Sequence, residues 1–278
     1  MKSDSVGLAS RVHLGCPQLY EHCFSCEPGV SMNTTTVTAA SGLRARMQEL
    51  DMLANNLANS GTSGFKLDRE FYSLFSAADN GVDGEASNTT LPVIRKQWTD
   101  FSQGTLQPTG NPLDMALSGP GFFTVNGPSG PLYTRNGSFK VSSTGALTTL
   151  DGNAVTGSDG KPIQIPPGGP VVVGSDGSLT QDGESIGQLK IVDFKDPNAL
   201  GKIGNSYFSG TAENPPLPAT GVSVDQGRIE GSNVAPAESA VRLVGVMRQF
   251  EMLQKAISLT TDMDKKSLDD VARVPSNA

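Results

Sequence analysis

Hydrophobic residues recur at helical spacing early in the chain. They follow one another in steps of three and four at Ala40, Leu43, Met47, Leu50, Ala54 and Leu57. This is the spacing of the a and d positions of a coiled coil, maintained for about two and a half heptads. The sequence NSGTSG at 59–64 then supplies two glycines and an asparagine, which favour a helix end near Asn59. We therefore predict an amphipathic helix that ends there.

A second and longer helical pattern lies at the end of the chain. Pro236 suits the first position of a helix, Glu238 favours a helix amino terminus, and no proline follows before Val271. A helix of about 35 residues would be roughly 50 Å long, far above the average for globular proteins. One apolar stripe comprises Leu243, Met247, Phe250, Ile257, Leu268 and Val271, and a second comprises Met252, Ala256, Leu259 and Met263. Both apolar stripes must be shielded from water. We therefore expect the first helix to pack on one side of the long helix and another subunit to pack on the other.

Short β-type runs separated by turn dipeptides fill residues 118–225. In YTRNGSFKV, the pair Asn136–Gly137 predicts a hairpin with a type I′ turn. Asp-Gly pairs at 151–152, 159–160, 176–177 and 182–183 mark further turns. The Asp-Gly cluster at 176–184 could also suggest calcium, but it does not meet the EF-hand spacing. The core candidates of this region are Phe122, Phe123, Tyr133, Phe139, Leu189, Ile191 and Phe194.

These patterns predict an α+β fold. The N- and C-terminal helices pair in a coiled-coil-like bundle, and a β-rich middle domain projects from it. The expected divisions are 1–31 as an extension, 32–75 as the first helix with its turn segment, 76–117 as a connector and extended segment that is flexible over 76–90, 118–226 as the β-rich domain, and 227–278 as the long helix.

Composition excludes several classes of protein. The chain has 278 residues, with 32 Gly, 18 Pro, 6% aromatic residues and a formal charge of −7. An acidic chain without a basic stripe does not suit a general nucleic-acid binder. No apolar run is long enough to span a bilayer, so we expect no membrane insertion. Residues 1–31 lack the basic start and continuous apolar core of a secretory signal.

Every cysteine and histidine lies before residue 27. Thiolates and imidazoles two residues apart, as in HCFSC, can share a zinc ion. The alternative is that residues 1–31 are an upstream extension or follow from a mis-chosen start codon, because Met32 opens a segment of different character. The five residues are His13, Cys16, His22, Cys23 and Cys26.

The main body of the chain offers little catalytic chemistry. With no His or Cys after Cys26, it cannot contain a Ser-His-Asp triad, a Cys-His pair or a His-containing zinc centre. A glycosidase-type carboxylate pair remains conceivable, but nothing in the sequence singles out two acids. We therefore predict a protein that is not an enzyme and that has no cofactor, metal or catalytic site.

Four segments resemble the bacterial flagellar basal-body rod and hook family. The first, TAASGLRARMQELDMLANNLANSGTSGFK at 38–66, carries the family's Asn-Asn-Leu-Ala-Asn run followed by Gly-Phe-Lys. TGNPLDMALSGPGFFTV at 109–125 and YTRNGSFKVSSTGAL at 133–147 are similar to its central segment, and GRIEGSNVAPAESAVRLVGVMRQFEMLQKAIS at 227–258 to its C-terminal one. Within the family, RQFEMLQKAIS resembles proximal rod members more than distal ones. Ala235 departs from the usual Asn, which weakens the expected helix cap, and residues 1–31 have no counterpart.

The resemblance implies a structural subunit of the flagellar basal-body rod, which crosses the periplasm and transmits motor torque to the hook. It implies export through the flagellar type III apparatus without a cleaved signal peptide. It also implies that the terminal helices line the inner tube while the β domain faces outward. The expected partners are further copies of the chain, neighbouring rod and hook proteins, and the export apparatus.

Asparagines interrupt the apolar pattern at the end of the first helix. Asn55 and Asn59 lie four residues apart beside the seam. A buried amide paired across a subunit interface would disfavour the wrong register by roughly 1–3 kcal/mol. Asn59 could instead be a left-handed helix terminator. The predicted assembly interface comprises Leu43, Met47, Leu50, Ala54, Asn55, Leu57, Asn59, Leu243, Met247, Phe250, Leu253 and Ile257.

Two other classes of protein share this layout. A β-rich carbohydrate-active enzyme would need a pair of inward-facing carboxylates in a cleft. A tube-type or adhesin-type surface protein would use the same combination of helices and β domain. Loss of an adhesin would leave swimming intact, whereas loss of a rod subunit would abolish flagella.

Overall fold

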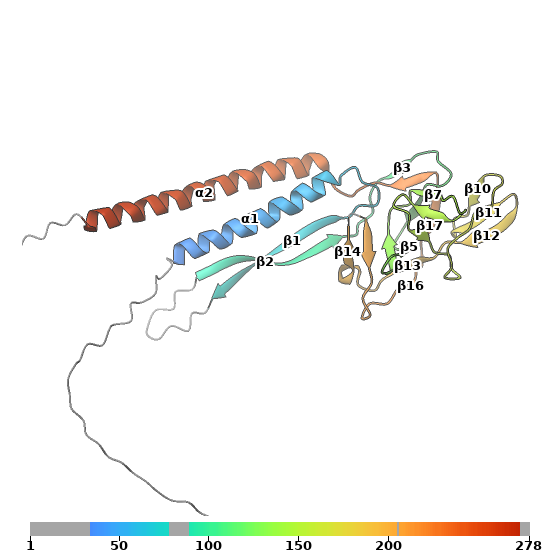
Figure 1. Cartoon of the computed structure of the whole chain (residues 1–278), viewed down its shortest axis with the longest axis horizontal. Coiled ribbons are helices and arrows are strands. Elements are labelled where there is room, and N and C mark those ends of the chain that lie inside the picture. The colour runs from blue at the N-terminus through green and yellow to red at the C-terminus, as the bar shows by residue number, and fades with distance from the viewer. Residues whose placement is uncertain (1–33, 78–88, 205, 273–278) are drawn as a thin grey trace, which may run out of the picture. The chain divides into compact units, whose positions relative to one another are not determined.

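The computed structural model describes residues 34–77, 89–204 and 206–272. Two long helices bracket a β-rich middle, α1 at Thr34–Ala58 and α2 at Pro236–Ala272 (Figure 1). The predicted combination of terminal helices and a β-rich middle is confirmed. Among the described residues, neither helix is long and apolar enough to cross a membrane.

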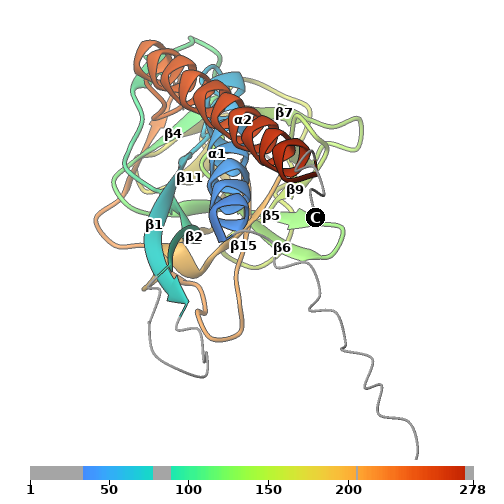
Figure 2. The ribbon, with the colours of Figure 1, turned by 90° about the vertical axis from the view of Figure 1, so that its left-hand side faces the viewer.

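A β-hairpin accompanies the two helices. Its strands are β1 (Leu67–Ala77) and β2 (Thr89–Asp100), which pair antiparallel. α1 contacts α2, β1 and β2, and it lies between α2 and the hairpin in both views (Figure 1, Figure 2). The sequence patterns did not predict this hairpin. Most of the expected flexible connector at 76–90 falls on 78–88, outside the described residues.

The middle of the chain is built from short antiparallel strands. The largest sheet has the order β14 (Gly201–Ile203), β15 (Tyr207–Ser209), β6 (Gly130–Thr134), β5 (Phe122–Gly127), β9 (Ala154–Val155), β8 (Leu147–Thr149) and β7 (Phe139–Val141). β13 (Ile191–Asp193) joins it by pairing with β5 and β16 (Leu217–Pro218). The remaining strands are β10 (Val171–Val173), β11 (Ser178–Gln181) and β12 (Glu184–Gln188) in one sheet, and the pairs β4 (Met115–Ser118) with β17 (Ser223–Gln226) and β3 (Leu106–Pro108) with β18 (Arg228–Glu230).

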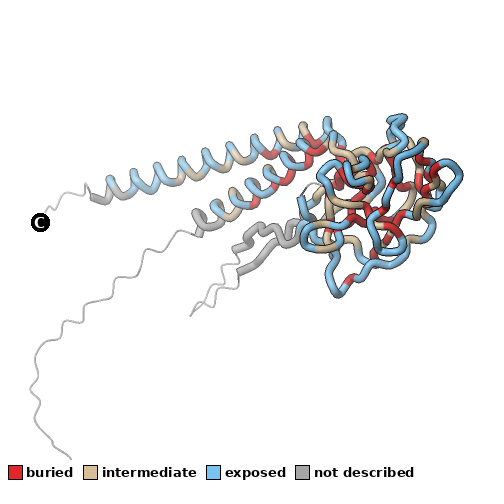
Figure 3. Tube along the Cα trace, turned by 45° about the vertical axis from the view of Figure 1, so that its right-hand side comes forward, coloured by how far each residue is buried: buried red, intermediate tan, exposed pale blue. Residues whose placement is uncertain are grey.

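Two hydrophobic clusters form the core of this β domain. The larger cluster contains Phe123, Phe139 and Leu189, and Ile191 packs against it half-buried. The smaller cluster contains Phe122, Tyr133 and Phe194, and its rings meet edge to face. The predicted core residues are therefore confirmed, with Ile191 at the margin. Figure 3 shows how burial concentrates in the β domain and decreases along the helices.

The predicted hairpin at Asn136–Gly137 is wrong. β6 pairs with β5 and β15, whereas β7 pairs with β8, and neither Asn136 nor Gly137 has the positive φ of a type I′ turn. The Asn136 Oδ1 atom accepts from the Ser138 amide instead, at 3.1 Å. A Cβ on Gly137 would lie 1.6 Å from the carbonyl oxygen of Met115. The glycine therefore serves a close backbone approach rather than a turn.

The Asp-Gly pairs do lie at turns. Asp182 and Gly183 connect β11 to β12 with φ values of 54° and 86°, which is the two-residue type I′ geometry. Asp176–Gly177 separates β10 from β11, and Asp151–Gly152 separates β8 from β9. Within the described residues, no group of three His, Cys, Asp or Glu is placed to hold a metal ion. The zinc alternative concerns residues before Met32, which lie outside the described part of the chain.

Candidate assembly surface and the junction behind it

Three buried charges meet where the helices join the β domain. We call Lys66, Arg135 and Glu230 the junction cluster. The Lys66 Nζ atom lies 2.5 Å from Glu230 Oε1, and the Arg135 Nη1 atom lies 3.3 Å from Glu230 Oε2. Lys66 follows α1, Arg135 follows β6 and Glu230 ends β18, so the cluster joins segments far apart in sequence. All three side chains are buried.

Backbone groups around the junction cluster add hydrogen bonds to Lys66 and Glu230, whereas the buried Nε atom of Arg135 has no hydrogen-bond partner. Lys66 also donates to the Ser102 carbonyl at 2.7 Å, and Glu230 Oε1 accepts from the Gly104 amide at 2.9 Å. Burial lowers the pKa of Lys66, and the adjacent Glu230 carboxylate acts in the opposite direction. Breaking such a buried pair by removing one partner costs about 3–5 kcal/mol, because the remaining charge is left uncompensated.

Further polar contacts hold the junction from both sides. Asn233, between β18 and α2, accepts from the Leu67 amide at 2.8 Å and donates to the Asp100 carbonyl at 2.7 Å. Lys202 of β14 lies 2.6 Å from the Asp68 carboxylate, and its Nζ atom is 4.1 Å from the centre of the Phe65 ring. The open end of the β1–β2 hairpin, where Leu67 pairs with Asp100, is therefore tied by Asn233 to the chain that leads into α2.

Glycines allow the backbone segments of the junction to touch. Gly64 has φ +69°, and a Cβ there would lie 2.3 Å from the amide nitrogen of Asn136. A Cβ on Gly104 would lie 2.0 Å from the Gly231 carbonyl oxygen. Because these contacts are with backbone atoms, a side chain at either glycine would force the segments apart.

The asparagines of α1 have separate roles within one chain. Asn56 is buried and pairs with the backbone of Asp68 in β1, donating from Nδ2 at 2.8 Å and accepting at Oδ1 at 3.0 Å. Asn59 is buried too, and its Nδ2 atom donates to the Asn55 carbonyl at 2.9 Å. The side chain of Asn55 is exposed. The structure thus adds Asn56, which the periodic pattern did not single out.

Asn59 ends α1 without a left-handed backbone. Among the described residues other than glycine, Asp182 alone has a positive φ, so the alternative that Asn59 is a left-handed terminator is wrong. Its side chain closes the last turn instead, because it donates to Asn55 and accepts from the Thr62 hydroxyl at 3.2 Å. The left-handed residue of this turn is Gly64.

An ionic network connects α1 with α2 and β1. Glu49 of α1 is buried and pairs with Arg46 at 2.5 Å and with Arg242 of α2 at 3.4 Å. Arg242 also lies 3.6 Å from the Glu70 carboxylate of β1. A buried polar residue, Glu49, therefore takes part in a helix–helix contact that the apolar pattern predicted to be a hydrophobic seam.

Among the predicted interface residues of the first helix and its end, Asn59 alone is buried in the single chain. Met47, Ala54 and Asn55 are exposed, whereas Leu43, Leu50 and Leu57 are half-buried, and Asn59 is buried at the helix end. The buried face belongs to other residues, because β1 and β2 cover α1 in addition to α2. These residues are Ala45, Glu49, Met52, Leu53 and Asn56.

The predicted interface residues of α2 lie mainly on its inner side. Leu243, Phe250, Leu253 and Ile257 are half-buried on the face on which Val246 is buried, and Met247 is exposed. The second stripe is more exposed than the first. Its members Met252, Leu259 and Met263 have exposed fractions of 64%, 56% and 69%. Val241, on the same outer side of the helix, has an exposed fraction of 75%.

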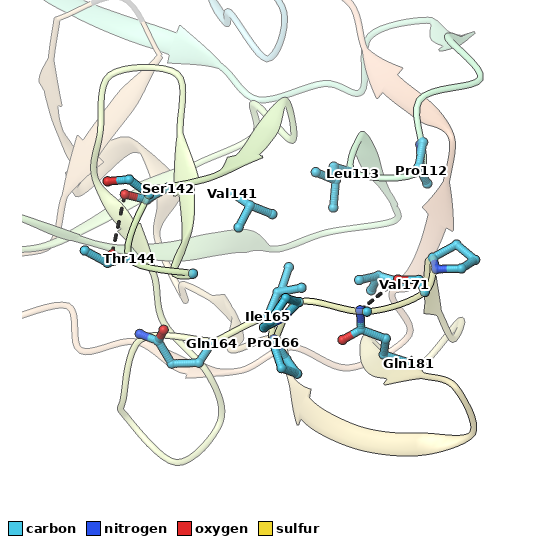
Figure 4. Close-up of a pocket in the computed structure, with 16 residues that line it drawn as sticks. Pro112, Leu113, Val141, Ser142, Thr144, Gln164, Ile165, Pro166, Val171 and Gln181 are labelled. Atoms are coloured by element: carbon cyan, nitrogen blue, oxygen red, sulfur yellow. Dashed lines mark hydrogen bonds between the residues drawn. The ribbon is translucent and has the colours of Figure 1, made fainter.

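The β domain carries a hollow of about 920 Å³. Leu113, Val141 and Ile165 face it (Figure 4), and four prolines contribute to its wall. The residues that line it include Ser, Thr and Gln but neither Asp nor Glu. A glycosidase needs two carboxyl groups about 5–9.5 Å apart, so this hollow does not supply the catalytic pair of a carbohydrate-active enzyme.

Three family models match successive parts of the chain. Residues 37–66 match "Flagella basal body rod protein", residues 116–183 match "Flagellar hook protein FlgE/F/G D1 domain", and residues 225–270 match "Flagellar basal body rod FlgEFG protein C-terminal". Each residue of the junction cluster lies in a different matched segment, with Lys66 in the first, Arg135 in the second and Glu230 in the third.

Relatives extend the match over most of the chain. The flagellar basal-body rod protein FlgF of Caulobacter vibrioides is 31% identical over 232 residues, which is 82% of this chain and 93% of that protein. The flagellar basal-body rod protein FlgG of Buchnera aphidicola subsp. Schizaphis graminum is 32% identical over 252 residues, 81% of this chain and 95% of that protein. The flagellar basal-body rod protein FlgG of Borreliella burgdorferi is 34% identical over 251 residues, which is 81% of this chain and 94% of that protein. The chain therefore belongs to the family of bacterial flagellar basal-body rod and hook proteins.

Proposed function

We propose that this chain is a structural subunit of the flagellar basal-body rod, which assembles through its terminal helices and transmits torque from the motor to the hook. The observation that carries the proposal is the apolar outer side of α2. Val241, Met252, Leu259 and Met263 are exposed in the single chain. Exposed apolar stripes of this kind mark protein–protein contacts.

Helical geometry separates the two faces of α2. At 3.6 residues per turn, Val241 and Leu259 point to one side of the helix, while Val246, Phe250 and Ile257 point to nearly the opposite side. The inner side meets α1 within the chain, as the pairing of Arg242 with Glu49 indicates. The outer side then remains for a neighbouring subunit, and the helices of several subunits would form a coiled-coil-like bundle.

The lengths of the helices support the same arrangement. α1 has 25 residues and α2 has 37, which corresponds to about 38 Å and 56 Å of helix at 1.5 Å per residue. α1 therefore cannot cover the whole length of α2. The outer side of α1, with Met47 and Ala54, would complete the contact between copies.

The remaining parts of the proposal follow from membership of the family. The partners are further copies of the chain and neighbouring rod and hook proteins, with the flagellar type III apparatus exporting the chain without a cleaved signal peptide. The location is the basal body, where the rod spans the periplasm. The segment RQFEMLQKAIS favours the proximal rod. The proposed role is structural and requires no catalysis.

A charge on the outer side of α2 tests the proposal. We expect Leu259→Glu to prevent incorporation into the rod, because a carboxylate without a partner would be buried between subunits. Gln254→Glu is the matched control, since Gln254 is an exposed residue of the same helix away from the outer stripe. Secreted and basal-body fractions would be compared in a strain that lacks the native gene. Normal incorporation of Leu259→Glu would contradict the proposed interface.

The phenotype of the strain that lacks the native gene distinguishes the proposal from the alternative functions. A deletion that abolishes flagella agrees with a rod subunit, whereas normal swimming after deletion would favour an adhesin-type protein. The hollow without carboxylates does not favour a carbohydrate-active enzyme.

A further inference from the structure

We propose that the hollow of the β domain receives an exposed proline-rich segment, residues 215–218, of a neighbouring copy of the chain. We call these four residues the proline segment. The contact would join β domains directly, in addition to the contact between helices described above. The inference rests on the proposed function, because the second copy must be a neighbour in the same assembly. It requires a folded β domain and places no demand on the terminal helices before assembly.

The hollow is suited to an uncharged, apolar occupant. The described residues that line it include no charged side chain, and its wall contains Leu113, Val141, Ile165 and four prolines (Figure 4). The wall also contains Gln181, which is buried and whose Oε1 atom has no hydrogen-bond partner. A buried acceptor without a partner is unfavourable. An occupant that brings an apolar side chain and a hydrogen-bond donor would therefore complete this site.

The proline segment has the matching chemistry. Its sequence is PPLP, all four residues are exposed, and the exposed fraction of Leu217 is 50%. The nearest charged residues along the chain are Glu213 and Asp225, so the segment can enter an apolar site without bringing a charge out of water. Thr220, two residues after the segment, carries a hydroxyl group that can donate to an acceptor such as Gln181 Oε1.

The proline segment is held in one shape before it binds. Leu217 and Pro218 form β16, which pairs with β13. Just before the segment, the buried Asn214 donates from Nδ2 to the Asp196 carbonyl at 2.7 Å. Proline rings also fix their own backbone φ. A segment that is already rigid loses little conformational freedom on binding, so even a small contact can be specific.

The hollow and the proline segment lie on different parts of the β domain. In Figure 1, β16 lies at the lower edge of this domain, whereas β7 and β10, which supply Val141 and Val171 to the hollow, lie higher. A contact between the two surfaces in neighbouring copies is therefore heterologous. Repeated heterologous contacts that do not close into a ring produce open helical assemblies, which is the arrangement that a rod requires.

Cross-linking within purified basal bodies tests the contact. Ser143 at the hollow and Ala212 shortly before the proline segment are exposed and would be replaced by cysteine, with Cys16, Cys23 and Cys26 changed to serine. A short bis-maleimide then joins copies in which the two surfaces are adjacent. We expect a cross-linked dimer of the chain when both cysteines are present, and no dimer when either cysteine is present alone.

Two aspartate variants in this background test the surfaces themselves. Leu217→Asp and Val141→Asp each place a carboxylate in the proposed contact, so each should abolish the dimer. The matched controls are Leu150→Asp and Val172→Asp, which change exposed apolar residues of the same domain outside the hollow and the proline segment. Both controls should keep the dimer. The near-ultraviolet circular dichroism of each purified variant verifies that its β domain is folded.

The outcomes distinguish this contact from the proposed function. The contact is overturned if basal bodies contain the chain but give no dimer, or if the dimer survives both Leu217→Asp and Val141→Asp. A cross-link to a different rod protein in place of a second copy would also overturn it. Absence of the chain with its native sequence from basal bodies would instead contradict the proposed function, which incorporation of Leu259→Glu tests separately.

Discussion

The three asparagines near the end of α1 differ in what they bind. Asn56 holds both backbone groups of Asp68, and Asn59 closes the last turn of the helix. The amide of Asn55 is exposed and lies beside a polar recess that also contains Asp51 and Lys202. Two of the asparagines are therefore explained by the fold of one chain, while Asn55 remains a candidate for setting the register between subunits.

The role of Asn56 predicts a local loss of stability. Asn56→Leu removes two hydrogen bonds and leaves the Asp68 amide and carbonyl without their partner. Unsatisfied buried polar groups cost about 1–3 kcal/mol each, so we expect a destabilisation of roughly 2–4 kcal/mol. Hydrogen exchange at the Asp68 amide, together with urea unfolding, measures the effect.

Asn55→Leu is the matched control for stability. Because Asn55 is exposed in the single chain, its replacement should change stability by about 0.5 kcal/mol or less. If Asn55 sets the register, Asn55→Leu should instead produce irregular assemblies with impaired motility. Equal destabilisation by the two leucine variants would contradict the separate roles, and uniform assemblies with normal motility would contradict register control by Asn55.

At the scale of elements, α2 has two apolar sides with different surroundings. The inner side carries the half-buried Phe250 next to the buried Val246, and the outer side carries exposed residues such as Leu259. The α1–α2 contact also contains the buried Glu49 and its arginines. The pairing of the helices is therefore part apolar and part ionic, and it leaves one side of α2 uncovered by the described residues of the chain.

Truncation of Phe250 should weaken assembly without unfolding the β domain. A fully buried Phe→Ala change costs about 3–5 kcal/mol, and we expect roughly 2–3 kcal/mol for the half-buried Phe250. The loss would recur in every subunit of the rod. We predict that Phe250→Ala is exported but not stably incorporated, as measured from secreted and rod fractions.

Lys265→Ala serves as the comparison for Phe250→Ala. Lys265 is exposed near the end of α2, and its truncation should change stability by about 0.5 kcal/mol or less. Equal incorporation of the two variants would show that the inner side of α2 is not needed for assembly.

At the scale of the whole chain, the β domain and the helices differ in how much of their surface the chain itself covers. The β domain has two buried clusters and antiparallel sheets. The helices keep apolar sides exposed, and a helix without its packing partners is marginally stable in water. The β domain should therefore be stable alone, whereas the terminal helices should depend on assembly.

Limited proteolysis of the monomer tests this division. We expect cleavage within 32–60 and 237–278, which leaves a resistant core from the middle of the chain. Cleavage should decrease when the protein is incorporated into the rod. Resistant ends with a degraded middle would contradict the division.

Local patterns in the sequence determined the end of the first helix, the start of the second and several turns of the β domain. The apolar spacing, Pro236 and NSGTSG placed the helices, and the Asp-Gly pairs placed turns, because helix ends and tight turns depend on a few neighbouring residues. The aromatic residues of the β domain likewise identified its core, since large apolar side chains are buried wherever the strands meet. The family motifs indicated the class of protein to which the chain belongs.

The tertiary structure alone decided which surfaces meet. The hairpin β1–β2 covers α1 and so shifts its buried face from the Leu43–Leu57 spacing to Ala45, Glu49 and Asn56. Gly137 is needed because its backbone approaches the Met115 carbonyl closely, and it does not form the predicted turn. Lys66 and Glu230 are 164 residues apart and could not be paired from sequence spacing. Burial of a charge or an amide depends on partners from distant segments, which no local pattern specifies.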